Sequence, residues 1–246
     1  MKFIGIIPAR FASSRFPGKP LIDIGGKTMI QRVYEQALKS TSLSKVTVAT
    51  DDARIFEHVQ SFGGSVVMTS ESHQSGTDRC YEAAANSGVE KDAVVLNIQG
   101  DEPFILPQQI DLLCSCFADE AVKIATLVKK IENESELQNP STPKVIINKN
   151  SEAIYFSRSI IPFVRNKEVG KWLAAAVFYK HIGIYAYRME TLFEITQLEQ
   201  SALEIAESLE QLRWIENGYK IKTAITQHES IAVDTPQDLE KLKGLF

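Results

Sequence analysis

Short apolar runs alternate with amphipathic segments through the first half of the chain. Runs typical of buried strands occupy residues 3–8, 45–49, 65–69 and 93–98. Segments with apolar residues at helical spacing follow them at residues 28–39, 53–62, 77–87 and 106–117. Because near-continuous apolar strands alternate with helices, the pattern predicts a mostly parallel central sheet with helices on both faces.

The pattern changes after about residue 120. Strand-like runs now follow one another with fewer helices between them, at residues 124–128, 145–147, 154–157, 181–187 and 220–225. An acidic helix is predicted at 203–215, and a last helix after Thr235-Pro236, which suit an N-cap and a first helical position. We therefore expect an α/β fold with antiparallel edge strands in the C-terminal half, in a single domain of residues 1–246 with halves 1–120 and 121–246.

Ligands of open α/β sheets bind at the carboxyl ends of the strands, so the residues directly after each strand deserve scrutiny. The first strand leads into a Pro/Gly/Ser loop that carries Arg10, Arg15 and Lys19. Such a cluster, assisted by loop N–H groups, is typical of a site for a phosphate-bearing ligand. The alternative is that these three cations are solvated surface charges.

Two familiar phosphate-binding motifs are excluded. Pro20 follows Gly18-Lys19 where a P-loop requires a hydroxyl residue. The glycine fingerprint of dinucleotide-binding folds is also absent, which argues against an NAD-dependent oxidoreductase.

Two aspartates suit a divalent cation. Asp101 follows the apolar run 93–98, and Asp234 follows the short run 231–233. Mg²⁺ is usually held by one or two carboxylates together with substrate phosphates, so Asp101 and Asp234 are candidate ligands. The alternatives are a turn residue for Asp101 and helix-start electrostatics for Asp234.

Composition narrows the class of protein further. The chain has 246 residues and a net charge of −4, which argues against a nucleic-acid partner held by bulk electrostatics. Cys80, Cys114 and Cys116 are sparse and read as reduced thiols packed in the fold. No signal-peptide pattern and no apolar run of membrane-spanning length occurs, so we expect a cytoplasmic protein without a membrane partner.

Several motifs together resemble the sugar-acid cytidylyltransferases that activate 3-deoxy-manno-octulosonate (Kdo) as CMP-Kdo for lipopolysaccharide biosynthesis. They occur in family order at residues 7–10, 14–21, 48–51, 73–79, 97–103, 155–158, 181–185, 209–213 and 233–236. The first loop is shared with other sugar nucleotidyltransferases. The combination of His73–Arg79, Gly100–Pro103 and Leu209–Arg213 is specific to a much smaller group of these enzymes.

The resemblance implies a Rossmann-like nucleotidyltransferase fold and transfer of CMP from CTP to Kdo, with Mg²⁺ and release of pyrophosphate. It assigns CTP binding to Ala9, Arg10, Arg15, Lys19, Ser75, Gly76 and Arg79. It assigns Kdo binding to Gln99, Arg158, His181, Tyr185, Glu210 and Gln211. It assigns metal binding to Asp101 and Asp234, and catalysis to Arg10, Arg15, Lys19 and Asp101. It also implies a homodimer, with sugar binding and dimerisation in residues 121–246.

The residues leave some alternatives open. The acceptor could be another sugar acid, such as sialic acid or an amino variant of Kdo. A domain that senses nucleotides without chemistry is a second alternative, although it would need only some of these cations and aspartates. His181 could be a general base rather than a binding residue, and Asp51 is expected to orient its loop rather than bind metal.

Overall fold

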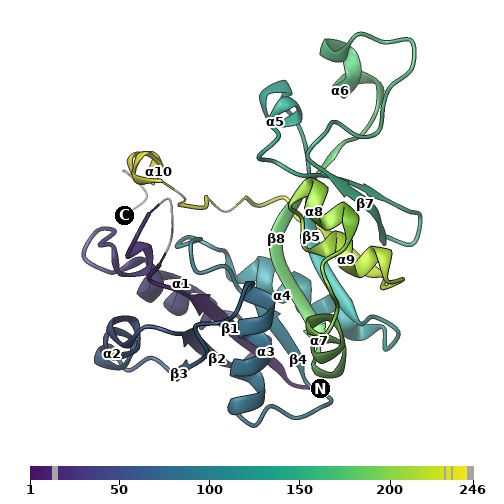
Figure 1. The fold of residues 1–246 in the computed structure, drawn as a ribbon. Helices are drawn as coiled ribbons and strands as arrows, with labels where there is room; N and C mark the ends of the chain where they lie inside the picture. The colour runs from purple at the N-terminus through teal and green to yellow at the C-terminus, as the bar shows by residue number, and fades with distance from the viewer. Residues whose placement is uncertain (13–15, 230, 234, 243–246) are drawn as a thin grey trace. The chain divides into compact units, whose positions relative to one another are not determined.

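The structure is a computed structural model that describes residues 1–12, 16–229, 231–233 and 235–242 (Figure 1). Two compact units emerge from its internal contacts. Unit 1 comprises residues 1–114, 186–196 and 230–246, and unit 2 comprises residues 115–185 and 197–229.

Unit 1 is built on a parallel sheet. Its strands are β1 (Phe3–Ala9), β2 (Leu43–Thr50), β3 (Val66–Met68) and β4 (Val94–Asn97), in the order β3-β2-β1-β4. Its helices are α1 (Met29–Ala37), α2 (Ala53–Ser61), α3 (Gly76–Asn86), α4 (Pro107–Ser115), α7 (Met189–Thr196) and α10 (Pro236–Leu242), with the 3-10 turn η1 (Lys19–Leu21). The four predicted strand–helix repeats are confirmed.

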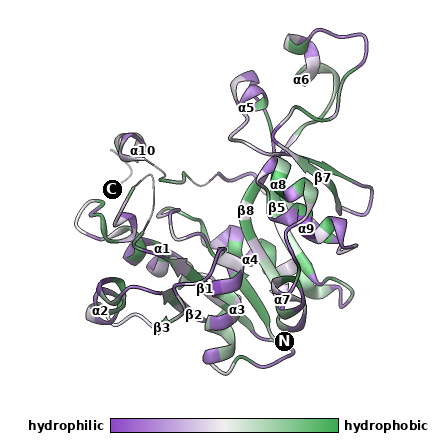
Figure 2. Ribbon diagram, in the orientation of Figure 1, coloured by the Kyte–Doolittle hydropathy of each residue, from purple (hydrophilic) through white to green (hydrophobic). Residues whose placement is uncertain are grey.

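The burial pattern explains why these runs form a sheet. Every residue of β4 is buried, as are most of β1 and the last five residues of β2. In Figure 2, β1 and β4 carry mostly hydrophobic colours, whereas α2 and α3 show both hydrophobic and polar residues. A strand buried on both faces has to be apolar throughout, while a covering helix needs only one apolar face.

Unit 2 combines parallel and antiparallel pairing. Its strands are β5 (Ile124–Lys130), β6 (Lys144–Ile147), β7 (Ala153–Ser157), β9 (Ile221–Ile225) and most of β8 (Tyr179–Arg188). Strand β5 pairs in parallel with β9, whereas β6 pairs antiparallel with both β7 and β8. The expected antiparallel strands in the C-terminal half are therefore confirmed.

The helices of unit 2 are short. They are α5 (Glu134–Gln138), α6 (Trp172–Ala175), α8 (Ala202–Glu207) and α9 (Gln211–Glu216), with the 3-10 turns η2 (Cys116–Ala118) and η3 (Val169–Lys171). The sequence pattern missed α5, α6 and α7, which are too short or too apolar for a clear helical period.

The prediction of one helix over residues 203–215 is wrong. Helix α8 ends at Glu207, and the next residue, Ser208, has left-handed backbone angles (φ 50°, ψ 50°). The Arg158 guanidinium accounts for this break, because Nε donates to the Glu207 carbonyl (2.6 Å) and Nη2 donates to the Ser208 carbonyl (3.2 Å). These carbonyls find donors outside the helix, so the helix ends and α9 begins in a new direction.

The thiols are packed as expected. Cys80 and Cys114 are buried, Cys116 is partly exposed, and none of these three described residues is in a disulfide bond. Burial raises the pKa of the Cys116 thiol. Within the described parts of the chain, no helix has both the length and the apolar character needed to cross a membrane.

Asp111 on α4 fixes the loop between α1 and β2. Its carboxylate accepts hydrogen bonds from the Ser40 hydroxyl (2.6 Å), the Thr41 hydroxyl (3.2 Å) and the Ser42 amide (3.0 Å). Burial alone would raise the pKa of Asp111, but the hydrogen bonds from Ser40 and Ser42 outweigh burial and hold the pKa below its usual value.

We therefore expect Asp111→Asn to lower the free energy of unfolding at pH 7 by about 1–3 kcal/mol. A folded-state pKa below the unfolded one gives stability that is present above the unfolded pKa and is lost as pH falls through the folded pKa. The difference between variant and wild type should thus shrink below about pH 4. Denaturant unfolding at both pH values measures it, with the exposed Asp92→Asn as the control. An equal loss at both pH values would contradict the assignment to the ionised carboxylate.

Candidate functional site

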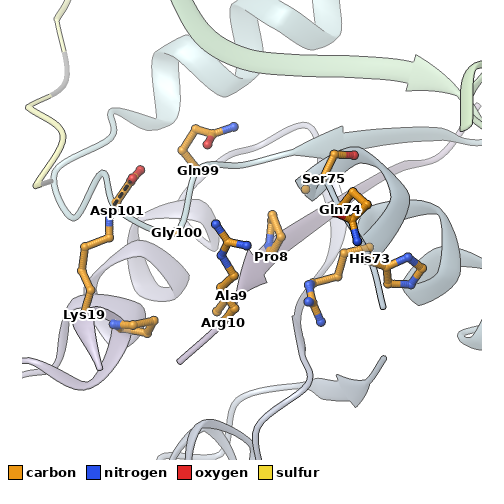
Figure 3. A pocket seen from close by; sticks show the side chains of 13 residues that line it. Pro8, Ala9, Arg10, Lys19, His73, Gln74, Ser75, Gln99, Gly100 and Asp101 are labelled. Carbon is orange, nitrogen blue, oxygen red and sulfur yellow. Dashed lines mark hydrogen bonds and ion pairs between the residues drawn. The ribbon is translucent and has the colours of Figure 1, made fainter. Parts of the chain in front are cut away.

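A cavity of about 280 Å³ lies in unit 1 (Figure 3). Its lining residues are Pro8, Ala9, Arg10, Lys19, Pro20, His73, Gln74, Ser75, Gly76, Arg79, Gln99, Gly100 and Asp101. They come from the carboxyl ends of β1 and β4, from η1, and from the start of α3 with the loop before it. The chain runs from β1 outward to β2 and β3 and then returns to β4 on the other side of β1, so the cavity lies at the topological switch point.

Backbone packing brings the segments after β1 and β4 close together. The Ile98 amide donates to the Ile6 carbonyl (2.9 Å), which extends the pairing beyond β4. A Cβ atom on Gly100 would lie 2.8 Å from the Pro8 carbonyl oxygen. Glycine is therefore required at this position, because any side chain would push the floor of the cavity apart.

The predicted cationic loop contributes two described side chains to the cavity. Lys19 Nζ forms an ion pair with Asp101 Oδ2 at 2.8 Å, drawn as a dashed line in Figure 3, and only 14% of its side chain is exposed. Arg10 is exposed and also lines the cavity. Arg15 lies outside the described residues. For Lys19, the alternative of a solvated surface charge is wrong.

The loop carrying these cations has its own supports. Gly18 has positive φ (71°), and its amide donates to the Phe11 carbonyl (3.0 Å). The Arg54 guanidinium carbon lies 3.3 Å from the centre of the Phe11 ring, a cation–π contact. The backbone of Lys19 is thereby set before any ligand binds.

Of the two predicted metal ligands, Asp101 is the one that lies among the described residues. Asp101 is partly exposed, with a quarter of its side chain accessible, and its carboxylate already faces the Lys19 ammonium. No group of three or more His, Cys, Asp or Glu side chains in the described part of the chain could enclose a metal ion by itself. Asp234 lies outside the described residues; the neighbouring Val233 amide donates to the Asp101 carbonyl (2.9 Å). One carboxylate in an open cavity suits an ion that also takes ligands from a bound phosphate.

The start of α3 forms another wall of the cavity. Ser75 and Asp78 form a capping box, in which the Ser75 hydroxyl accepts from the Asp78 amide and the Asp78 carboxylate accepts from the Ser75 amide. Arg79 is only 4% exposed, and its guanidinium donates to Asp51 Oδ2 (2.5 Å) and to the Thr69 hydroxyl (2.6 Å). The prediction that Asp51 orients its surroundings agrees with this geometry.

His73, which lines the cavity, is held in place by Glu82. Its Nε2 lies in short contact with the Glu82 carboxylate on α3, which also accepts from the Ser70 amide (2.8 Å). Burial opposes the charge of Glu82, but hydrogen bonds from Ser70 and His73 outweigh burial and lower the pKa of this carboxyl group. Glu82 thus fixes the loop 70–75 at two points.

Most residues predicted to bind the sugar acid lie in unit 2, whereas Gln99 lies in unit 1 and lines the cavity described above. Arg158 is strongly engaged with backbone carbonyls. A guanidinium has five N–H groups. Three of them donate to the carbonyls of Pro140, Glu207 and Ser208. Among the described residues, the other two N–H groups of Arg158 have no hydrogen-bond acceptor, so they are candidates for an anionic ligand.

His181 and Tyr185 share one face of β8, as their even spacing predicts. Their ring centroids are 5.1 Å apart, and Tyr185 packs edge-on against Trp214 (5.1 Å). Burial lowers the pKa of His181 to about 3. Burial and the nearby Glu210 carboxylate raise the pKa of the Tyr185 phenol well above its usual value. Both rings are thus neutral near pH 7.

Glu210 and Gln211 stand where α9 begins. Arg213 holds this turn through a 2.8 Å ion pair with Glu204 and a 3.6 Å ion pair with Glu210. Gln211 is only 5% exposed, and its Nε2 has no hydrogen-bond partner among the described residues. A buried amide donor without a partner is costly, so Gln211 Nε2 is a candidate for a hydrogen bond to a ligand.

Sequence reasoning missed the residues that hold the predicted ones. Glu82, Thr69 and Glu207 gave no signal, because their partners are distant in the sequence or lie in loops. Thr126, whose hydroxyl contacts His181 Nε2, could be recognised as a polar residue inside the apolar run 124–128. Its contact with His181 could not be inferred without the strand pairing.

Comparisons with known proteins point to one family. Residues 4–221 match the cytidylyltransferase family. The chain is 63% identical to a 3-deoxy-manno-octulosonate cytidylyltransferase of Parabacteroides distasonis, covering 98% of this chain and 96% of that protein. It is 60% identical to the protein of the same name from Bacteroides thetaiotaomicron, with the same coverage of both chains.

Solved structures place the fold in the same group. A CMP:2-keto-3-deoxy-manno-octonic acid synthetase complexed with CTP superimposes with a TM-score of 0.92 at 46% identity, covering 100% of this chain and 98% of the other. A cytidylyltransferase from Leptospira borgpetersenii shares the fold alone, with a TM-score of 0.65 at 17% identity, covering 99% and 85% of the two chains. The predicted nucleotidyltransferase fold is confirmed.

The Gly100 contact yields a prediction. Gly100→Ala should lower the free energy of unfolding by about 1–3 kcal/mol, because its Cβ would collide with a backbone carbonyl that cannot rotate away. It should also weaken binding of CTP, used as the probe because the solved relative holds it. Denaturant unfolding and calorimetric titration measure the two effects. Gly170→Ala is the control, since its Cβ would meet only the Glu134 side chain at 3.5 Å. Unchanged stability and CTP affinity in Gly100→Ala would disprove the close approach.

Proposed function

This chain belongs to the cytidylyltransferase family, and from that premise we propose that it transfers CMP from CTP to the anomeric hydroxyl of Kdo, releasing pyrophosphate. The observation that carries the proposal is the cavity at the carboxyl ends of β1 and β4, where Lys19 pairs with the Asp101 carboxylate and Arg10 also lines the wall. Cations and a carboxylate together suit a magnesium–nucleotide complex better than either a free anion or a free cation.

The phosphates of CTP are bound, in this proposal, by Arg10, Arg15 and Lys19. These side chains neutralise the negative charge that grows on the departing pyrophosphate. Asp101, with Asp234, would hold Mg²⁺, which when bound polarises phosphate oxygens and lowers the pKa of a coordinated hydroxyl. Lys19 pairs with Asp101 in the free protein, and with Asp101 holding a cation the Lys19 ammonium would be available to the phosphates.

The cytosine and ribose would be read by the Ala9 backbone and by the Ser75–Arg79 segment. This wall is pre-organised, since the capping box fixes Ser75 and the Asp51 ion pair fixes Arg79. Backbone groups that do not have to reorganise discriminate well between bases, because a wrong base leaves a buried polar group without a partner. This supports selection of CTP over other nucleotides.

Kdo is a polyhydroxylated carboxylate, and the residues predicted to hold it suit that chemistry. Arg158 has two N–H groups left for the carboxylate. Gln211 has a buried amide donor, and Glu210 supplies a carboxylate acceptor for hydroxyls. Gln99, His181 and Tyr185 complete the set. A non-catalytic nucleotide sensor would not need this second group of polar residues.

The reaction itself needs little covalent help from the protein. The anomeric hydroxyl of Kdo attacks the α-phosphorus of CTP, the bond to pyrophosphate breaks, and the hydroxyl proton leaves to solvent. Positioning and charge neutralisation dominate in transfers of this kind. His181 is a poor general base near pH 7, since a base with a pKa of about 3 holds a proton too weakly.

A homodimer is part of the proposal. Unit 2 contains an apolar cluster of Ile131, Leu137, Trp172 and Phe178. Around it, Phe163 and Val177 are 74% and 52% exposed. Exposed aromatic and aliphatic side chains beside an apolar cluster favour contact with a second copy. The cytoplasmic location and the absence of nucleic-acid partners remain predictions.

The first experiment is pyrophosphate release from each of the four NTPs with Mg²⁺, with and without Kdo. We expect release only with CTP plus Kdo. Sialic acid and amino-Kdo serve as alternative acceptors, and removal of Mg²⁺ tests the metal requirement. CTP binding without Kdo-dependent release would contradict the proposed acceptor and leave the nucleotide site in place.

Asp101→Asn tests the metal site. The substitution keeps the size of the side chain but removes the charge that a hard cation needs, so kcat should fall by roughly 100-fold or more. CTP should still bind, because the cations of the first loop remain. Steady-state kinetics and calorimetric CTP titration separate the two effects, with Asp92→Asn as the control. Wild-type turnover in Asp101→Asn would exclude Asp101 as a metal ligand.

A further inference from the structure

Thr126 on β5 is completely buried, and its hydroxyl neighbours the Tyr185 phenol as well as three other polar atoms. The Ile184 carbonyl oxygen is 2.8 Å away, the Ile182 carbonyl oxygen is 3.2 Å away, and His181 Nε2 is 3.1 Å away. All of these atoms belong to unit 2. A single hydroxyl therefore joins β5 to the backbone of β8 and to the imidazole of His181.

The hydrogen-bonding capacity of the hydroxyl decides where the protons lie. A threonine hydroxyl has one proton to donate, and a carbonyl oxygen can only accept. If Thr126 donated to His181 Nε2, its oxygen would face two carbonyl oxygens without any proton between them. The repulsion is avoided when Thr126 donates to the nearer carbonyl, that of Ile184, and accepts a hydrogen bond from a protonated His181 Nε2.

We propose that Thr126 is a positioning residue for binding of the sugar acid: its hydroxyl holds His181 as the tautomer protonated at Nε2, which leaves Nδ1 as an acceptor for a substrate hydroxyl. The proposal rests on the proposed function, because it assigns a role to one residue of the Kdo set. It goes further in fixing the tautomer, which the residue type alone leaves undecided.

The surroundings of the ring support this arrangement. Phe156 packs edge-on against His181 with ring centroids 5.2 Å apart, and Tyr185 lies on another side at 5.1 Å. These contacts orient the imidazole without using its nitrogens. No hydrogen bond of His181 Nδ1 occurs within the described chain, so this nitrogen is available to a ligand.

The neutral state of the ring agrees with the proposal. Burial lowers the pKa of His181 to about 3, so the imidazole carries a single proton near pH 7. A neutral imidazole has one donor and one acceptor nitrogen, and fixing the donor fixes the acceptor. The polyhydroxylated substrate then meets a hydrogen-bond acceptor.

Nitrogen-15 NMR of the histidine ring tests the tautomer in the free enzyme, with CTP and Kdo absent. The signals of His181 are assigned as those that a His181→Asn variant lacks. We expect wild type to show a protonated Nε2 and an unprotonated Nδ1. Thr126→Val, which keeps the shape and removes the hydroxyl, should lose this preference, and Thr126→Ser should retain it. A protonated Nδ1 in wild type, or an unchanged tautomer in Thr126→Val, overturns the assignment.

Kinetics test the role of the tautomer in binding. Thr126→Val should raise the KM for Kdo roughly 3- to 10-fold, which is the effect expected from the loss of one hydrogen bond. The KM for CTP should stay unchanged. Thr126→Ser should restore the wild-type KM. Thr223→Val is the matched control, because Thr223 is also buried, pairs with Thr126 across β5 and β9, and donates only to the Ser151 carbonyl (3.0 Å). The control should leave both KM values unchanged.

The outcomes separate this inference from the proposed function. An unchanged KM for Kdo in Thr126→Val, or an equal rise in the KM for both substrates, overturns the role of Thr126 in sugar binding. Absence of Kdo-dependent pyrophosphate release in wild type overturns the proposed function and the substrate role of Nδ1 with it. An active wild type with a protonated Nδ1 overturns the assignment for Thr126 alone. Denaturant unfolding of Thr126→Val confirms that the variant is folded before these results are interpreted.

Discussion

The parallel pairing of β1 with β2 on one side and β4 on the other is the constraint on which the nucleotide site depends. Parallel pairing aligns the carboxyl ends of all these strands at one edge, so loops distant in the sequence meet there. The segments after β1 and β4 approach each other closely beside the cavity, since only a glycine fits at residue 100 next to the Pro8 carbonyl. Lys19 and Asp101 can therefore form an ion pair although 82 residues separate them.

The sequence was informative where one physical rule dominated. Apolar runs predicted the strands of unit 1, because a strand covered on both faces cannot carry charge, and capping residues such as Ser75 and Asp52 stand where the helices begin. Arg10, Lys19 and Asp101 followed from the positions of the strands, because they come after them, whereas Gly76 and Gln99 were assigned by the family resemblance. Lys19, Gly76, Gln99 and Asp101 do line one cavity.

The rest depended on contacts between residues that no local pattern connects. The break at Ser208 could not be predicted, because it arises from the bonds of Arg158 to the end of α8, 49 and 50 residues away. The buried partners of His73 and His181 were missed for a similar reason. In a sequence, a buried polar residue can be recognised only as a polar position within an apolar run. Which residue it pairs with depends on the strand order and register.

Arg158, proposed to bind the sugar-acid carboxylate, also has a structural role. Its Nε and Nη atoms close the end of α8, and the turn that follows sets the start of α9, where Glu210 and Gln211 stand. The same guanidinium keeps two N–H groups for an anion. An anion bound there would strengthen the hold on α8 as well, since a paired guanidinium moves less. The proposed binding of the sugar acid at Arg158 would therefore be coupled to the geometry of Glu210 and Gln211 through one side chain, and a change at Arg158 would alter both together.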